Sequence, residues 1–466
     1  MYQNTKNPMA TVSLCSVCAR QLTGTPPNVD QSWKCSVCFG IMDPEYINGV
    51  ANAVKAALDS NQYDSQSFVL ALNVPVSVML REAIFAHLRK AGDVENKGSL
   101  ESVPFKTRMV DAYIGKLKAI TGLRPTLNSL LTLTITFANV EFNVADSRFL
   151  LKHFGTDFVP NRKLKRYEQL KPLETNFTKV RISNLLSKIT SDIASDYNWV
   201  SPTEPCTYSF TFERAPLFIA SRYCKYSRSL PQSPWTASEE IPKIEGNSVS
   251  EKIAAVLKNE LKCDSTRFIA CGREDVDVRM LGNGRPFVVQ CINPHLTQKL
   301  TGKNLSGTLK SLEEIINADK DISLGCNLKV VTADEVEALK VDQEEKRKCY
   351  TAYCYSTEAI DNDKLSTLSS LTPLEIIQKT PVRVLKRRSL LERKRTIFLM
   401  ESLKVDDYHF LLRLETQAGT YVKEFVHGDF GRTRPSLAEL IGLSCKADVD
   451  ILELDVEYVD MQWPPS

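Results

Sequence analysis

Two pairs of cysteines near the N-terminus restrict the fold of this chain more sharply than any other feature of its sequence. Each pair has two residues between its sulfurs, and the spacing of the two pairs is typical of a four-thiolate zinc site. Such a site is tetrahedral, with each sulfur about 2.3 Å from the metal, and it leaves no ligand position open for catalysis. The alternative is four unrelated buried thiols. We expect one structural Zn²⁺ bound by Cys15, Cys18, Cys35 and Cys38.

The length and composition indicate a globular chain of several domains. A chain of 466 residues is too long for one hydrophobic core and predicts about two to four domains. The net charge of +3 does not reveal a nucleic-acid partner, so that partner must be inferred from where the charges lie. Thirteen cysteines without a secretory pattern indicate a reducing compartment, the nucleus or the cytoplasm, with a mitochondrial fraction left open. The apolar stretches are strand-sized, so we expect no membrane partner.

Hydrophobic periodicity predicts an α/β region followed by an α+β region. In the first region it predicts a helix over Tyr46–Leu58 and strands over Leu131–Phe142 and Thr207–Arg214. In the second it predicts a helix over Ile253–Leu261, which a capping box at Ser248–Glu251 would open. Strand candidates then recur at Phe268–Cys271, Phe287–Ile292, Tyr350–Tyr355, Phe410–Leu414 and Ile451–Val456. This order is typical of a large mixed or antiparallel sheet.

A cluster of positive charge lies between Lys379 and Arg395. Eight basic residues in this segment accompany one acid, Glu392. Such a run is commonly a solvated face, but this one repels itself strongly unless a polyanion is near. We expect it to bind RNA, and that binding to weaken steeply with salt.

An acidic loop separates two of the strand candidates. The segment CGREDVDVRMLGNGRPF, residues 271–287, contains three carboxylates and three arginines. Arginines nearby would keep a carboxylate ionised, as a nucleophile or base requires. Composition alone favours a structural ion-pair network at least as strongly. The GNG run lacks the third glycine of a dinucleotide-binding loop and no GxxxxGK[ST] motif occurs, so we expect no nucleotide cofactor.

The acidic loop resembles the catalytic loop of the tRNA pseudouridine synthase 10 family of archaea and eukaryotes. The resemblance continues in KCYTA (348–352), QKTPVRVLKRR (378–388) and TQAGTYVKEFVHGDFGRTRP (416–435). RYCKYSRSLPQSPW and LELDVEYVDMQWPP also resemble the family, so the likeness covers the last half of the chain closely and the front half in plan. It implies a pseudouridine synthase fold that isomerises uridine 54, uridine 55 or both in the TΨC arm of tRNA. It also implies that catalysis needs no cofactor.

The resemblance assigns roles to the charged residues of the site. Asp275 falls on the catalytic aspartate, with Glu274 and Asp277 in support. Lys423 occupies the basic position that pairs with this aspartate. The resemblance leaves open whether Asp275 adds to the sugar or removes a sugar proton.

Three further residues are assigned to the substrate by the same likeness. Tyr350 occupies the place of the tyrosine that stacks on the target base, and Leu440 resembles the apolar residue that packs near the site. Without the likeness, both would be taken as core residues. Arg273 is expected near the displaced base.

The resemblance also predicts the order of domains. A zinc-binding cysteine-knuckle segment (1–45) would precede a THUMP-like α/β accessory domain that binds RNA (46–225), and the pseudouridine synthase domain would follow (226–466). In the basic segment, Lys386, Arg387 and Arg388 would lie on a thumb-like loop that binds the RNA. A non-enzymatic RNA-binding scaffold or RNA-processing factor with the same fold is the alternative. A zinc-ribbon protein that binds other proteins would leave the acidic loop unexplained.

Overall fold

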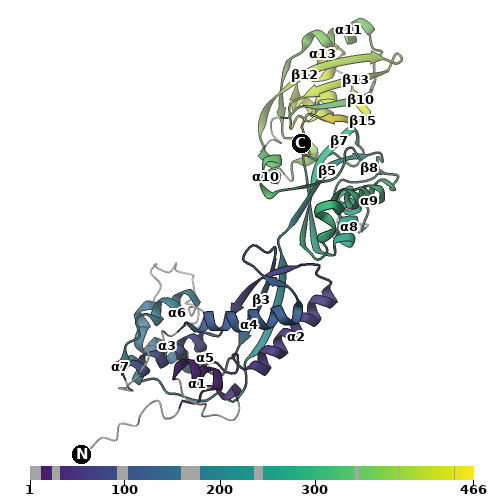
Figure 1. Cartoon of the computed structure of the whole chain (residues 1–466). Coiled ribbons are helices and arrows are strands. Elements are labelled where there is room, and N and C mark those ends of the chain that lie inside the picture. The colour runs from purple at the N-terminus through teal and green to yellow at the C-terminus, as the bar shows by residue number, and fades with distance from the viewer. Residues whose placement is uncertain are drawn as a thin grey trace, which may run out of the picture. The chain divides into compact units, whose positions relative to one another are not determined.

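The computed structural model describes residues 12–23, 32–91, 103–158, 179–235, 245–341, 346–386, 388–444 and 447–465. The chain divides into two compact units, Met1–Arg214 and Ala215–Ser466, each with its own hydrophobic core (Figure 1). Within the described ranges, no helix has both the length and the apolar character needed to cross a bilayer.

The first unit is built on a four-stranded mixed sheet of strand order β2-β1-β3-β4. The strands are β1 (Ser67–Asn73), β2 (Arg124–Pro125), β3 (Leu131–Ala138) and β4 (Thr207–Arg214). β1 pairs in parallel with β2 and β3, and β4 pairs with β3 in the antiparallel sense. Alternate residues of β3 are buried, as the period of two predicts for a sheet with one covered face.

The strand predicted over Leu131–Phe142 ends earlier, at Ala138. The side-chain oxygen of Asn139 accepts a hydrogen bond from the N–H of Glu141 at 3.0 Å, which turns the chain. Phe142 then occupies the N-cap position of helix α5 (Asn143–Phe154). The apolar residues beyond Ala138 therefore belong to the next element.

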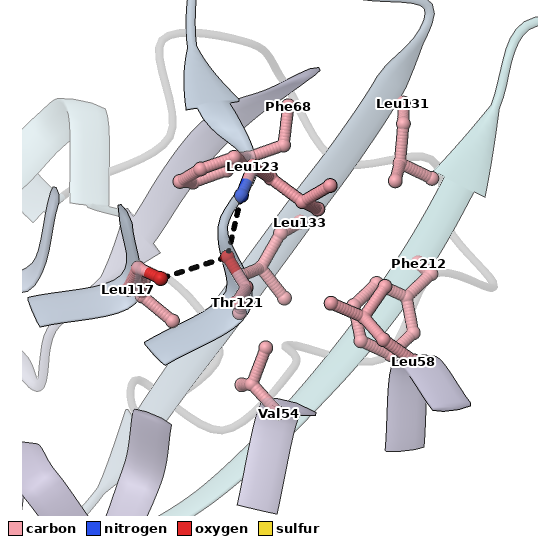
Figure 2. Close-up of a pocket in the computed structure, with 9 residues that line it drawn as sticks. All are labelled: Val54, Leu58, Phe68, Leu117, Thr121, Leu123, Leu131, Leu133 and Phe212. Carbon is pink, nitrogen blue, oxygen red and sulfur yellow. Dashed lines mark hydrogen bonds between the residues drawn. The ribbon is translucent and has the colours of Figure 1, made fainter. Parts of the chain in front are cut away.

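The helix predicted over Tyr46–Leu58 is confirmed as α2 (Pro44–Asn61). The carboxylate of Asp43 caps it by accepting from the N–H of Tyr46 at 2.9 Å. A small apolar pocket lies between this helix, α4 (Phe105–Thr121) and the sheet (Figure 2). It is lined by Val54, Leu58, Phe68, Leu117, Thr121, Leu123, Leu131, Leu133 and Phe212. Its volume of about 10 Å³ is that of a single water-sized probe, so it is a gap in the packing of the core. The other described helices of this unit are α1 (Ser16–Leu22), α3 (Val76–Ala91), α4 (Phe105–Thr121), α5 (Asn143–Phe154), α6 (Lys179–Leu186) and α7 (Ser191–Ser195).

The second unit contains an eleven-stranded sheet, which confirms the predicted large mixed sheet. Its order is β14-β11-β12-β13-β10-β15-β7-β5-β8, with β6 paired to β7 and β9 paired to β5. β15 and β7 run in parallel, and the other described pairings are antiparallel. The strands are β5 (Leu217–Lys225), β6 (Cys263–Ala270), β7 (Arg279–Pro294), β8 (Ile322–Leu324), β9 (Lys329–Val331), β10 (Lys348–Ser356), β11 (Leu374–Lys379), β12 (Glu392–Lys404), β13 (His409–Thr416), β14 (Thr433–Arg434) and β15 (Val449–Val459).

The second predicted helix is confirmed as α8 (Val249–Leu261), which contacts β6 and β7 and lies beside α9 (Leu305–Asn317) (Figure 1). Ser248 caps it, since its hydroxyl oxygen accepts from the N–H of Glu251 at 3.2 Å. The five predicted strands fall in β6, β7, β10, β13 and β15, with Cys271 one residue past the end of β6. The remaining described helices are α9 (Leu305–Asn317), α10 (Ala333–Val341), α11 (Asn362–Thr367), α12 (Val422–His427) and α13 (Leu437–Leu440).

The boundary between the units differs from the one expected from the sequence. The predicted accessory domain extends to residue 225, but β5 pairs with β7 in the sheet of the second unit. Arg222 and Lys225 are buried in this strand because main-chain carbonyls accept their side-chain hydrogen bonds. In the sequence alone, a strand that contains Arg222 and Lys225 cannot be distinguished from a basic linker. Residues 12–23 and 32–42, which the sequence analysis treated as a separate segment, share the core of the first unit.

Candidate active site and cysteine cluster

The acidic loop predicted over residues 271–287 is shorter in the structure, where it spans residues 271–278, because β7 begins at Arg279. It joins β6 to β7 and begins with a tight bend at Gly272. This glycine has φ = +86°, and a Cβ there would lie 2.8 Å from Nη1 of Arg285 and 3.0 Å from Nζ of Lys348. The backbone conformation therefore favours glycine, and a Cβ would also displace the ends of these two side chains.

Glu274 anchors this loop from inside the fold. Its buried carboxylate accepts a hydrogen bond from Nε of Arg285 at 2.7 Å and from the hydroxyl of Tyr223 at 2.9 Å. Gln232 donates in turn to the Tyr223 hydroxyl at 2.7 Å. A buried carboxylate with this many partners stabilises the fold and is closed to a substrate.

A second buried residue, Lys225, fixes the main chain beside Asp275. Its ammonium group donates to the carbonyl oxygens of Leu230, Asp275 and Val276 at 2.9, 3.1 and 2.8 Å. The main chain at Asp275 is therefore fixed by a buried group, whereas the side chain of Asp275 is partly exposed.

The side chain of Asp275 is 44% exposed and faces two cations. Its Oδ2 lies 3.3 Å from Nη1 of Arg383 and 3.6 Å from Nζ of Lys423. Arg383 also donates from Nε to Oε1 of Glu424, which is buried, at 2.6 Å. The site thus combines an accessible carboxylate with two positive charges whose positions are set by other acids.

Lys423, at the start of α12, bridges two acids of the loop. Its Nζ lies 2.6 Å from Oδ2 of Asp277, closer than the 3.6 Å to Asp275. Partial burial acts to raise the pKa of Asp277, but the hydrogen bond and charge of Lys423 outweigh it and lower the pKa below its usual value. The structure therefore brings Lys423 and Asp275 together, as expected, with Asp277 as a third member.

Tyr350 lies in β10 and packs against the core of the second unit. Burial raises the pKa of Tyr350 to about 12, with the charge of Arg285 acting in the opposite direction, so the phenol keeps its proton at neutral pH. Lys348, two residues earlier, has its pKa lowered to about 8 by burial and by the like charge of Arg285. Leu440, at the end of α13, is partly buried and packs against the same core.

The basic segment runs from the last residue of β11, through the connection between β11 and β12, to the first residues of β12. Lys386 and Arg388 are exposed on it, and Arg387 lies outside the described residues. Arg383, in the 3₁₀ helix Val382–Val384, is the residue of this segment described in contact with Asp275. Arg273, in the acidic loop, is exposed.

Arg383 belongs to the predicted charge cluster but is not among the site residues predicted from the sequence. Seven other basic residues lie in the same segment, and nothing in the sequence distinguishes Arg383 from them. Its buried partner, Glu424, is distant in the sequence, so their contact follows from the fold alone.

The four cysteines of the first unit form one buried cluster. The sulfurs of Cys15, Cys18, Cys35 and Cys38 all lie within 4.8 Å of one another. Sγ of Cys15 and Sγ of Cys38 are 3.7 Å apart, far more than the roughly 2.05 Å of a disulfide. Bonds of about 2.3 Å to a tetrahedral zinc ion would place neighbouring sulfurs about 3.8 Å apart. The donor set and its spacing therefore fit one zinc ion.

Comparison with known proteins establishes the family. Residues 35–213 match the model of the eukaryotic Pus10 N-terminal region, and residues 218–460 match that of the Pus10 C-terminal region. The tRNA pseudouridine synthase Pus10 of Xenopus laevis is 37% identical over 448 residues, which are 93% of this chain and 81% of that protein. The human protein of the same name is 36% identical, again over 93% of this chain, and 79% of its own length is covered.

Among solved structures, the chain is similar to a Cbf5-Nop10-Gar1 complex, with 18% identity over 51% of this chain and 48% of that one. The TM-score of 0.26 is too low to establish a shared fold. Both halves of the chain nevertheless match the same family in sequence. The chain therefore belongs to the Pus10 family, whose members named above are tRNA pseudouridine synthases.

Proposed function

We propose that this protein isomerises uridine to pseudouridine in tRNA and that Asp275 starts the reaction. The observation that carries the proposal is the accessible carboxylate of Asp275 between Arg383 and Lys423. The neighbouring Glu274 is buried and fully engaged with Arg285 and Tyr223, so it is not the acid that a substrate reaches. Membership in the Pus10 family supplies the reaction.

The chemistry suits one carboxylate and no cofactor. The C1′–N1 bond of uridine breaks and a C1′–C5 bond forms, C5 loses a proton and N1 ends with one, so the reaction is balanced without a second substrate. Asp275 either adds to the sugar or removes a sugar proton, and both routes require an ionised carboxylate held close to the sugar. Arg383 and Lys423 would hold it in place while leaving one face open.

The target base must leave its stack to reach this acid. Extrusion costs a few kcal/mol, which contacts to the displaced base and to the RNA backbone offset. In the proposal, the protonated phenol of Tyr350 stacks on the uracil, Leu440 supplies apolar contact and Arg273 lies near the displaced base. Lys386, Arg387 and Arg388 on the β11–β12 connection bind phosphates.

We further propose which uridines are modified and what the accessory unit does. The uridine is number 54, number 55 or both, in the TΨC arm, and the second unit has the pseudouridine synthase fold. The first unit has a THUMP-like plan and binds RNA. One Zn²⁺ in the cysteine cluster stabilises it, and the spacing of the four sulfurs supports the zinc site. We place the enzyme in the nucleus, the cytoplasm or both.

The test measures pseudouridine, position by position, in unmodified tRNA transcripts treated with the parent protein or with Asp275→Asn. Asp275→Asn should yield no detectable product and should bind tRNA within about three-fold of the parent, because one uncharged substitution removes little binding energy. Asp407→Asn is the matched control, since Asp407 is an exposed acid paired with Lys404 at 2.9 Å in the same unit. Binding without product from the parent would instead support a non-enzymatic RNA-binding scaffold.

A further inference from the structure

Phe430 is the most exposed large apolar residue of the part of the chain that the structure describes, with 95% of its surface accessible. It follows α12, the helix that carries Lys423. An exposed phenylalanine lacks the stabilisation that an aromatic side chain normally gains from burial.

The backbone that presents Phe430 is strained. Asp429 and Phe430 have φ values of +47° and +56°, and the glycines on either side have +75° and +77°. Two consecutive residues with a Cβ in the left-handed region are disfavoured by contact between Cβ and the backbone. Such strain persists only where the surroundings hold it, and it is common at binding sites.

Asp429 holds the strained turn in place. Its buried carboxylate accepts from the N–H of Val382 at 3.1 Å and forms an ion pair with Nε of Arg432 at 3.6 Å. Its own N–H donates to Nδ1 of His427 at 3.1 Å, and Arg432 donates to the carbonyl oxygen of Thr380 at 2.7 Å. The ring of Phe430 is therefore presented on a rigid support.

The same segment connects this turn to the catalytic acid. Val382 holds Asp429 through its N–H, and the next residue, Arg383, contacts Asp275. Along α12, only a few residues at about 1.5 Å each separate Lys423 from the turn. The turn that carries Phe430 is therefore joined to the Asp275 site by two routes, through Val382 and through α12.

An exposed cation accompanies the exposed ring. The side chain of Arg434 is 71% exposed, and its Nη2 would lie 3.4 Å from a Cβ at Gly431. Its closest acid, Glu439, is 3.9 Å away. The guanidinium thus lies near the residue that follows Phe430. An exposed ring and a nearby arginine together suit a base and its phosphate.

We propose that Phe430 is a stacking platform for a base of the substrate RNA next to the target uridine, with Arg434 at the adjoining phosphate. The proposal rests on the proposed function, because it requires RNA at Asp275. Extrusion of the uridine removes a stacking partner from its neighbours, and a rigid aromatic ring at the edge of the site replaces that partner.

The test compares Phe430→Ala, Phe430→Leu and Phe430→Trp in tRNA affinity and in kcat/KM. Stacking on a protein ring contributes enough that its loss should reduce both by about 5- to 150-fold in the Ala and Leu variants, whereas Trp should stay within about three-fold of the parent. 2-Aminopurine next to the target should be quenched by the parent and by Phe430→Trp, and much less by Phe430→Leu. Leu403→Ala is the matched control, since Leu403 is 64% exposed near the far end of β12.

Phe430→Gly separates recognition from folding. Glycine relieves the left-handed strain, so the midpoint of thermal unfolding should rise while the affinity for tRNA falls. If Phe430 had only a structural role, Phe430→Gly would lower both the midpoint of thermal unfolding and the affinity for tRNA. Parent affinity and quenching in the Ala and Leu variants would overturn the inference. Absence of product from the parent would refute the proposed function, and the binding comparison would still decide on Phe430.

Discussion

At the scale of single residues, each acid of the 271–278 loop has its own basic partner. Arg285 binds Glu274 inside the fold, Lys423 lies closest to Asp277, and Arg383 lies closest to Asp275. Charge is thus divided so that the acid with two cations nearby is also accessible. Replacing any of these basic residues should change the ion pairs that the remaining ones form. Arg383 is the most informative one to replace, because it contacts both Asp275 and Glu424.

Arg383→Gln should reduce both activity and stability. It removes a cation from Asp275 and leaves the buried carboxylate of Glu424 without its described partner, which costs about 1–3 kcal/mol of unfolding free energy. Adding Glu424→Gln should restore the stability, measured by urea unfolding, but not kcat/KM for tRNA. Recovery of activity in the double variant would contradict a direct role at Asp275. Arg413→Gln is the control, because Arg413 also bridges two carboxylates, at 3.1 and 3.2 Å.

Lys348 should make the stability of the second unit depend on alkaline pH. Burial, with Arg285 nearby, lowers the pKa of Lys348 to about 8 from an ordinary value of 10.5. Below pH 8 the folded and unfolded states both carry the proton, whereas between about 8 and 10.5 the unfolded state binds more protons. The free energy of unfolding therefore rises with pH in that window, by at most about 1.4 kcal/mol per pH unit.

Lys348→Met should show a smaller rise than the parent when unfolding by urea is compared between pH 7.5 and 9.5. Part of the rise should remain, because burial also lowers the pKa of Lys225 to about 8. The exposed Lys303→Met should keep the slope of the parent. Parallel curves for the parent and Lys348→Met would show that Lys348 does not titrate in this range.

At the scale of elements, the β11–β12 connection has two roles. Arg383 on it faces Asp275, and Lys386 and Arg388 are exposed. Neutralising Arg387 and Arg388 together should weaken tRNA binding and reduce the slope of log affinity against log salt by about 1 to 2, because each phosphate contact releases counterions. The exposed pair Lys303 and Lys310, neutralised in the same way, removes the same charge and should leave the slope unchanged. Equal slopes for the first pair and the parent would refute RNA contact at these positions.

Periodicity in the sequence predicted the elements whose burial repeats locally. The helices α2 and α8 and the strand β13 show that regularity, whereas β7 is buried continuously over residues 284–289 and was predicted from its apolar run. The start of the second unit could not be predicted, because burial of Arg222 and Lys225 depends on carbonyl acceptors from distant parts of the chain. The role of Arg383 depends on Glu424 for the same reason. The cysteine cluster was predictable because its ligands follow a short and rigid spacing, and the sulfurs do lie together.

At the scale of the whole molecule, each unit has a separate core, so a loss of metal should affect the first unit alone. Cys35→Ser in the full chain should lower the zinc content from one ion per chain to none, because it removes one of the four thiolate ligands. Structural zinc contributes directly to folding, so the first unit should lose stability. Limited proteolysis should then cut within residues 12–213 and spare residues from 217 onward. Cys206→Ser is the matched control, since Cys206 is a buried cysteine of the same unit outside the cluster, and it should retain zinc. Zinc retained by Cys35→Ser would contradict the assignment.

The place of β15 between β10 and β7 has a consequence for synthesis on the ribosome. Residues 449–459 supply this strand, whereas β7 and β10 are complete by residues 294 and 356. During translation of the roughly hundred residues that separate β10 from the end of β15, which takes about 5–20 s, the nascent sheet exists as two parts with unpaired edges. Unpaired edges are the surfaces through which strands of different chains associate. A pause of the ribosome shortly before residue 449 would therefore prolong the stage at which this protein depends most on chaperones.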